Sequence, residues 1–225
     1  MNAPDFSDLR GIVSDAINAC ERAIIEGAPG VLLTGPAGMG ATMVARRLTS
    51  IFPAPTGHES RWISATYEGE FPGADYFPTR SAQNPRQGFH LPHGRPFRAP
   101  HYTISSSTLV VEARLARCGV LLLDELPEFR PDTIRALAPH LYTATHAPLV
   151  IATALACPCG ALGSDRACNC SLKIKTAYDV RITKACNALR IGIKARVPYM
   201  GVKEMRNSER GESSAEIRAR IERAL

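Results

Sequence analysis

The chain has 225 residues, of which 45% are hydrophobic and 21% charged, a composition typical of a soluble domain. No apolar run approaches the roughly 20 residues that span a bilayer, which argues against membrane insertion. The first residues, MNAPDFSDLRG, lack the basic flank and apolar stretch of a secretory signal, so we expect a cytoplasmic protein.

The net charge of +6 is concentrated in one part of the sequence. Between Lys173 and Arg206 nine lysines or arginines stand against only Asp179 and Glu204, whereas the rest of the chain is nearly neutral. Such a basic stripe is typical of surfaces that contact the phosphates of DNA, but a solvated basic face has the same composition. DNA is therefore one expected partner, and a plain solvent-exposed surface is the alternative.

The first half of the chain contains helix, strand, loop and helix patterns in that order. Residues 12–26 have mixed helical spacing and are followed by Gly27, a plausible helix stop. An apolar run at 31–34 predicts a strand, and good helix formers follow at 42–48. Residues 53–100 are rich in Pro, Gly and aromatic residues, so we expect long loops and short elements there.

In the second half, the apolar run at 120–123 ends in two acids and predicts a strand buried on both faces of a parallel sheet. Further strands are expected at 148–155 and 189–195, with a helix starting at Pro131. Ser213 and Glu216 form a possible capping box before a last helix whose Ile217, Ile221 and Leu225 share one face. Strands that alternate with helices predict a three-layer α/β fold with a mostly parallel sheet.

The segment GPAGMGAT resembles the Walker phosphate-binding pattern G-x-x-x-x-G-K-[ST], except that Ala41 stands where the lysine belongs. Its glycines allow successive backbone amides to surround a phosphate, and Thr42 can supply a hydroxyl ligand for magnesium. Loss of one hydrogen bond to a charged group costs about 1.5–3 kcal/mol, or roughly 10- to 150-fold in ATP affinity. The candidate nucleotide-binding residues are Gly35, Pro36, Ala37, Gly38, Met39, Gly40, Ala41, Thr42, Met43 and Asp124.

A second motif, LLLDE, places Asp124 and Glu125 at the carboxyl end of a predicted strand. A P-loop ATPase needs one such carboxylate on magnesium and one to position the attacking water, so Asp124 is a candidate magnesium ligand and Glu125 a candidate catalytic residue. The alternative is a pair of loop acids that happen to follow a strand.

Four of the seven cysteines lie close together in the sequence, as two C-x-C pairs separated by eight residues. A hairpin there would bring four thiolates into the tetrahedron that zinc accepts, so we expect a structural zinc site at Cys157, Cys159, Cys168 and Cys170. Free thiols on a flexible loop are the alternative.

Six segments in order, DFSDLRG, GPAGMGATMVARRL, RPFRAPH, GVLLLDELPEF, ACPCG and SERGESSAEIRARIERA, resemble ATPases of the ComM and magnesium chelatase subunit I family, a branch of the AAA+ proteins. The resemblance implies an AAA+ P-loop core over 1–200 with a cysteine-rich hairpin at 156–172, and a truncated helical lid that begins at 201–225. It further implies subunits assembled in a homo- or hetero-oligomeric ring with ATP at their interfaces, and it suggests Arg190 as a finger that reaches a neighbour's γ-phosphate.

The departures from this family concentrate where hydrolysis would occur. Ala41 replaces the lysine, and Leu155 replaces an asparagine that orients the nucleophilic water in the family. We therefore expect a nucleotide-binding module with weak or no hydrolysis. Two alternatives remain open: an active, ATP-driven DNA branch-migration motor, and a zinc-stabilised DNA-binding scaffold that binds no nucleotide.

Overall fold

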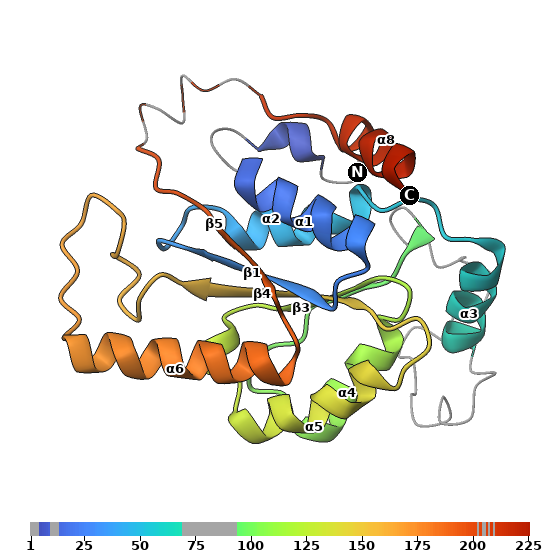
Figure 1. Ribbon diagram of the computed structural model, residues 1–225, viewed down its shortest axis with the longest axis horizontal. Helices are drawn as coiled ribbons and strands as arrows, with labels where there is room; N and C mark the ends of the chain where they lie inside the picture. The colour runs from blue at the N-terminus through green and yellow to red at the C-terminus, as the bar shows by residue number, and fades with distance from the viewer. Residues whose placement is uncertain are drawn as a thin grey trace, which may run out of the picture.

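The computed structural model describes residues 5–9, 14–68, 94–201, 203, 206, 208 and 210–225. Its centre is a five-stranded sheet in the order β2-β3-β4-β1-β5, in which every neighbouring pair is parallel (Figure 1). The strands are β1 (Gly30–Gly35), β2 (Phe97–Arg98), β3 (Val120–Leu123), β4 (Leu149–Leu155) and β5 (Ile193–Arg196). Because the strands are parallel, the segments that follow β1, β3 and β4 all emerge at one edge of the sheet.

Alternation along the strands divides the interior into two cores. Val31 and Leu33 of β1 face one core and Leu32 faces the other, as the two-residue period of a strand requires. All three side chains are buried, because helices cover both faces of the sheet.

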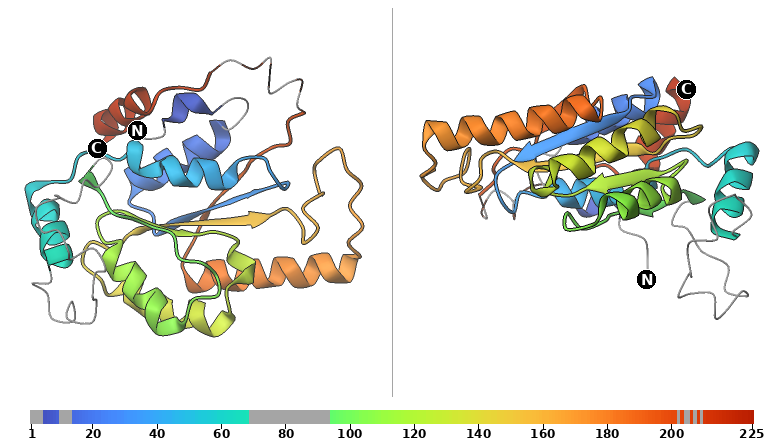
Figure 2. Two further views of the ribbon diagram at one scale, coloured as in Figure 1. Left: turned by 180° about the vertical axis from the view of Figure 1, so that it is seen from behind. Right: turned by 90° about the horizontal axis from the view of Figure 1, so that it is seen from below.

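Figure 1 shows α1 (Ser14–Glu26), α2 (Ala41–Arg47) and α8 (Ser214–Ala224) on one face of the sheet. The other face carries α4 (Ser106–Leu115), α5 (Pro131–Tyr142) and α6 (Leu172–Ala188). The first turns of α6 extend past the sheet beside the hairpin that follows β4 (Figures 1 and 2). These layers confirm the predicted three-layer α/β fold with a parallel sheet.

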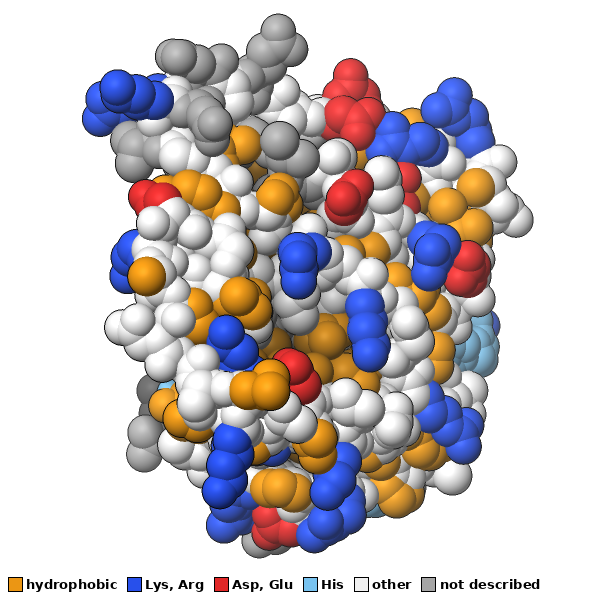
Figure 3. Space-filling model, turned by 60° about the vertical axis from the view of Figure 1, so that its left-hand side comes forward, with side chains coloured by type: hydrophobic (Ala, Val, Ile, Leu, Met, Phe, Trp, Pro, Cys, Tyr) orange, Lys and Arg blue, Asp and Glu red, His pale blue; other side chains and the backbone are white. Residues whose placement is uncertain are grey.

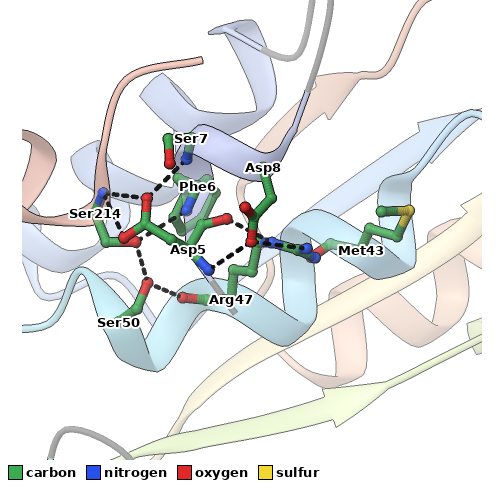
Figure 4. Close-up of polar contacts among 8 residues, drawn as sticks. All are labelled: Asp5, Phe6, Ser7, Asp8, Met43, Arg47, Ser50 and Ser214. Carbon is green, nitrogen blue, oxygen red and sulfur yellow. Dashed lines mark hydrogen bonds and ion pairs between the residues drawn. The ribbon is translucent and has the colours of Figure 1, made fainter. Parts of the chain in front are cut away.

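The short helix η1 (Phe6–Asp8) connects the start of the chain to α8, and η2 (Leu48–Ser50) also contacts α8. Phe6 is fully buried, and its amide donates to Ser214 Oγ at 3.0 Å (Figure 4). Asp5 caps η1 by accepting from the Ser7 amide at 2.8 Å, and it also accepts from the Ser214 amide. Arg47, at the end of α2, donates to the Asp5 carbonyl, so this network joins η1, α2 and α8.

Several sequence predictions agree with these elements, and others are wrong. Gly27 has φ +62° and ends α1, while Ser213 and Glu216 form the predicted capping box of α8. Long loops and short elements are predicted for residues 53–100, yet α3 (Gly57–Glu68) is a 12-residue helix. Residues 69–93 lie outside the described part of the chain.

The predicted strand at 189–195 begins later, at Ile193, because residues 189–192 form the turn that leads out of α6. Of the three residues predicted to share one face of the last helix, Ile217 and Ile221 are buried, whereas Leu225 lies just beyond the end of α8 and is 71% exposed. The predicted division into a core and a lid stays a prediction. In the structure α8 packs against α1 and shares its core.

Candidate nucleotide-binding site

The glycine-rich segment forms the connection between β1 and α2. Gly35 is the last residue of β1, Gly38 and Gly40 have φ of +80° and +91°, and Gly40 is the N-cap of α2. Only glycine adopts these angles without strain, so the backbone can curl as the motif predicts. Within the described residues, no protein acceptor is paired with the amides of Gly38, Gly40, Ala41 and Thr42. These donors are available to an anion.

The other loop residues have different surroundings. The Ala37 amide is already bonded, at 2.9 Å, to the carbonyl of Gly160 in the cysteine hairpin. Met39 is half-buried and its sulfur accepts from the Met200 amide, whereas Met43 is 48% exposed on α2. Pro36 is buried, and Ala41 is half-buried at the first position of α2.

The structure brings the two predicted magnesium ligands together. Thr42 Oγ1 lies 2.9 Å from Asp124 Oδ1 and donates to it. Two adjacent ligands of an octahedral magnesium at about 2.1 Å are separated by about 3.0 Å, so this pair has the spacing the ion requires. Asp124 comes directly after β3, and Thr42 lies in the first turn of α2.

Thr153 on β4 is hydrogen-bonded to both Asp124 and Glu125, a role that was not predicted from the sequence. Its hydroxyl donates to Asp124 Oδ1 at 2.6 Å and accepts from the Glu125 amide at 2.9 Å. The signal was present, since Thr153 is a single polar residue in the apolar strand LVIATAL. It is 4% exposed, so the hydroxyl satisfies two polar groups inside the sheet.

Glu125 has a left-handed backbone conformation, with φ 57° and ψ 52°, and its side chain is exposed. It lines a cavity of about 460 Å³ with Tyr102, Leu155, Tyr178 and Arg181. Burial raises the pKa of Tyr178 to about 12, so this phenol stays neutral beside the carboxylate. The buried face of α6 consists of three residues spaced four apart, Tyr178, Ile182 and Cys186. This spacing is helical, but it is hard to recognise in a segment with so many basic residues.

Arg190 does not join the other site residues within the chain. It lies in a left-handed turn before β5, at the amino edge of the sheet, whereas Asp124 follows the carboxyl end of β3. Its guanidinium carbon lies 3.8 Å from the centre of the Tyr142 ring. Arg190 can therefore reach a nucleotide only if that nucleotide is bound to another subunit.

The four clustered cysteines converge after β4. Cys157 Sγ lies 3.3 Å from Cys159 Sγ and 3.6 Å from Cys168 Sγ, and the ligand atoms of all four lie within 4.8 Å of one another. Four thiolates bound to zinc at about 2.3 Å are about 3.8 Å apart, so the cluster fits this ion with a small adjustment. Hydrogen bonds from the Ala161 amide and from Cys157 lower the pKa of Cys159 to about 6, which favours the thiolate that a metal needs.

A second group of possible metal ligands, Glu59, Cys118 and His146, is explained by other contacts. Both carboxylate oxygens of Glu59 accept from Arg95, at 2.9 and 3.1 Å, and one also accepts from the Thr56 amide. Arg95 is buried and donates to the carbonyls of Pro53 and Cys118, so this arginine of the RPFRAPH segment anchors a loop.

Basic side chains are also exposed on one side of the molecule. Figure 3 shows the side of the molecule from which the hairpin and the start of α6 project, with a hollow that exposes hydrophobic side chains and lysines and arginines around it. In α6, Lys173 and Lys184 are exposed, whereas Lys175 is half-buried. Within the described part of the chain, no helix is both long and apolar enough to cross a membrane.

A parallel sheet whose interior strand β1 leads into a glycine loop, with Asp124 directly after β3 hydrogen-bonded to Thr42, defines a P-loop nucleotide-binding domain of the AAA+ type. A family profile described as magnesium chelatase, subunit ChlI, matches residues 5–144, more than half of the chain. The chain therefore belongs to the magnesium chelatase subunit ChlI family.

Two relatives support this membership. The chain is 35% identical over 147 residues to competence protein ComM of Haemophilus influenzae, which is 60% of this chain and 25% of that protein. It is 38% identical over 119 residues to the uncharacterised protein YifB of Salmonella typhimurium, which is 49% of this chain and 21% of that protein. The chain thus matches about a quarter of the length of these curated relatives.

A solved P-loop NTPase domain of a sigma-54 transport activator from E. coli superposes on 85% of this chain and 99% of its own, with a TM-score of 0.38 and 15% identity. The fold assignment rests on the strand order and the loop geometry of the chain itself.

Proposed function

We propose that this chain is an ATP-binding module of the magnesium chelatase and ComM type in which hydrolysis is weak or absent. The observation that carries the proposal is the pairing of Thr42 with Asp124 beside a loop with free amides but no lysine. The amides of Gly38, Gly40 and Ala41 bind the phosphates of ATP. Thr42 and Asp124 hold its magnesium.

Two departures weaken the chemical step. Ala41 provides no ammonium group for the β- and γ-phosphates, whose charge is spread over the γ-oxygens in the transition state. Leu155, at the end of β4, gives the cavity beside Glu125 an apolar side chain where the family has an asparagine. The chain therefore binds ATP but hydrolyses it slowly or not at all.

The decisive experiment compares the natural chain with Ala41→Lys. The substitution restores the missing charged contact, so we expect affinity for magnesium-ATP to rise by roughly 10- to 150-fold in an equilibrium titration. Ala41→Met is the matched control, because it adds a chain of similar length without the charge, and it should leave the affinity unchanged. Equal gains from both substitutions would contradict the proposal, as would robust magnesium-dependent ATP turnover by the natural chain.

An active DNA motor is the second candidate, and the placement of Glu125 favours it. The Glu125 amide is bonded to the Thr153 hydroxyl that also holds Asp124, so the backbone of Glu125 is fixed directly beside this proposed magnesium ligand. In this case we expect DNA to stimulate ATP hydrolysis and Glu125→Gln to abolish the stimulated rate while nucleotide binding persists. Hydrolysis that survives Glu125→Gln would rule this candidate out.

The family and the basic charge of α6 also suggest partners for this chain. We propose zinc at Cys157, Cys159, Cys168 and Cys170, where it would fix the hairpin as a structural ion. The basic residues of α6 contact DNA, and ring neighbours bring Arg190 to the nucleotide. Tight, salt-sensitive DNA binding without any nucleotide affinity would instead select a zinc-stabilised scaffold. A cytoplasmic location remains a prediction.

A further inference from the structure

The cysteine hairpin and the phosphate loop are in direct contact. β1 pairs with β4 along its whole length, from Gly30 with Val150 to Gly35 with Leu155, so the loop and the hairpin leave the sheet side by side. The Ala156 amide then donates to the Gly35 carbonyl at 2.9 Å. In the loop, the amide of Ala37, the residue after Pro36, donates to the Gly160 carbonyl, also at 2.9 Å.

Gly160 lies directly after the second cysteine of the cluster and is tightly packed. Its φ is +71°, and a Cβ atom there would lie 2.8 Å from the Ala37 Cβ, closer than real Cβ contacts allow. Gly163, three residues on, has φ +86°, but its added Cβ would approach Pro36 only to the ordinary distance of 3.8 Å. The fit between hairpin and loop therefore depends on Gly160.

The hairpin has little structure of its own to hold this fit. The residues from Ala156 to Cys170 are all described, and they contain no helix or strand. Two backbone hydrogen bonds within the hairpin close turns, from the Gly160 amide to the Cys157 carbonyl and from the Ser164 amide to the Ala161 carbonyl. Cys157 is 1% exposed, and its sulfur accepts from the Leu162 amide at 3.3 Å. A metal on the four sulfurs would thus fix the position of the Gly160 carbonyl.

We propose that the metal-bound hairpin is a positioning element of the nucleotide site, so that zinc and magnesium-ATP each increase the affinity of the other. The inference rests on the proposed ATP-binding function. With metal bound, Gly160 holds the Ala37 amide and thereby the curve of the loop that presents the free amides of Gly38 and Gly40. Without metal the carbonyl is free to move and the loop must be ordered by the nucleotide itself, which lowers the affinity. Coupling between two sites of this kind typically amounts to about 5- to 150-fold, and it is reciprocal.

The test measures binding in both directions on the full chain. A fluorescent ATP analogue with magnesium is titrated into zinc-loaded protein and into protein stripped with a zinc-selective chelator, and we expect at least about fivefold tighter binding with zinc. Zinc affinity, measured against a competing chelator, should rise by the same factor when the analogue is present. Equal affinities with and without zinc would overturn the coupling alone. Failure of the zinc-loaded chain to bind the analogue would overturn the proposed function and the coupling together.

Two glycine variants keep the test independent of metal removal. Gly160→Ala should still bind one zinc but bind the analogue at least about fivefold more weakly, because its Cβ displaces Ala37. Gly163→Ala imposes a similar left-handed strain without that contact and should bind the analogue like the natural chain. If both variants bind zinc and lose nucleotide affinity equally, the loss comes from general strain in the hairpin and the inference is wrong.

Discussion

Thr153 illustrates how much of a site can depend on one hydroxyl group. It donates to the carboxylate of Asp124 and accepts from the amide of Glu125, so it orients the residues assigned to the metal and to the attacking water. Thr153→Val keeps the shape of the side chain but leaves these two polar groups without this partner. We expect the free energy of unfolding to fall by about 1–3 kcal/mol and magnesium-ATP to bind more weakly, as measured by urea unfolding and by titration. Thr153→Ser retains the hydroxyl and should stay close to the natural chain; a Val variant that matches the Ser variant would contradict this role.

At the scale of elements, the attachment of η1 to α8 should depend on pH. Burial acts to raise the pKa of Asp5, but hydrogen bonds from Ser7 and Ser214 outweigh it and lower the pKa below the usual 3.8. A carboxyl group with a lowered pKa in the folded state adds stability above its unfolded pKa, and this stability is lost as the pH falls through the folded value. The natural chain should therefore exceed Asp5→Asn in unfolding free energy by about 1 kcal/mol at neutral pH. The difference should shrink as the pH falls below 3.8, and a difference that is the same at pH 7 and pH 3 would contradict the assignment.

The elements also show what the sequence could and could not predict. Strands β1, β3 and β4 are predominantly apolar on both faces, a pattern typical of a sheet covered on both sides, and the fold class was predicted from them. Helices α3 and α6 were missed because their surfaces are polar, and only three residues of α6, Tyr178, Ile182 and Cys186, are buried. Motif spacing led to Thr42 and Asp124. The roles of Thr153 and Gly160 arise from contacts between strands and loops that no spacing encodes.

At the scale of the whole molecule, the site residues are divided between two edges of the sheet. The phosphate loop and Asp124 lie at the carboxyl edge and Arg190 at the amino edge. If Arg190 completes the nucleotide site, it does so between subunits, and ATP affinity should increase with protein concentration. Arg190→Ala should remove this dependence without changing the affinity at high dilution, as titrations at several protein concentrations would show. A dependence that persists in Arg190→Ala would assign the intersubunit contact to other residues.

The bond between the Phe6 amide and Ser214 joins residues 208 positions apart. During synthesis, the phenyl ring of Phe6 leaves the ribosome long before Ile217 and Ile221, the side chains of α8 that share its core, have been made. Contacts between residues so far apart in sequence form late, because the chain must lose the entropy of closing a long loop before the contact stabilises the fold. A nascent chain stalled before residue 214 lacks α8, so the part of this core that α8 covers stays exposed, and such a chain should be more prone to bind chaperones or to aggregate than one that includes α8.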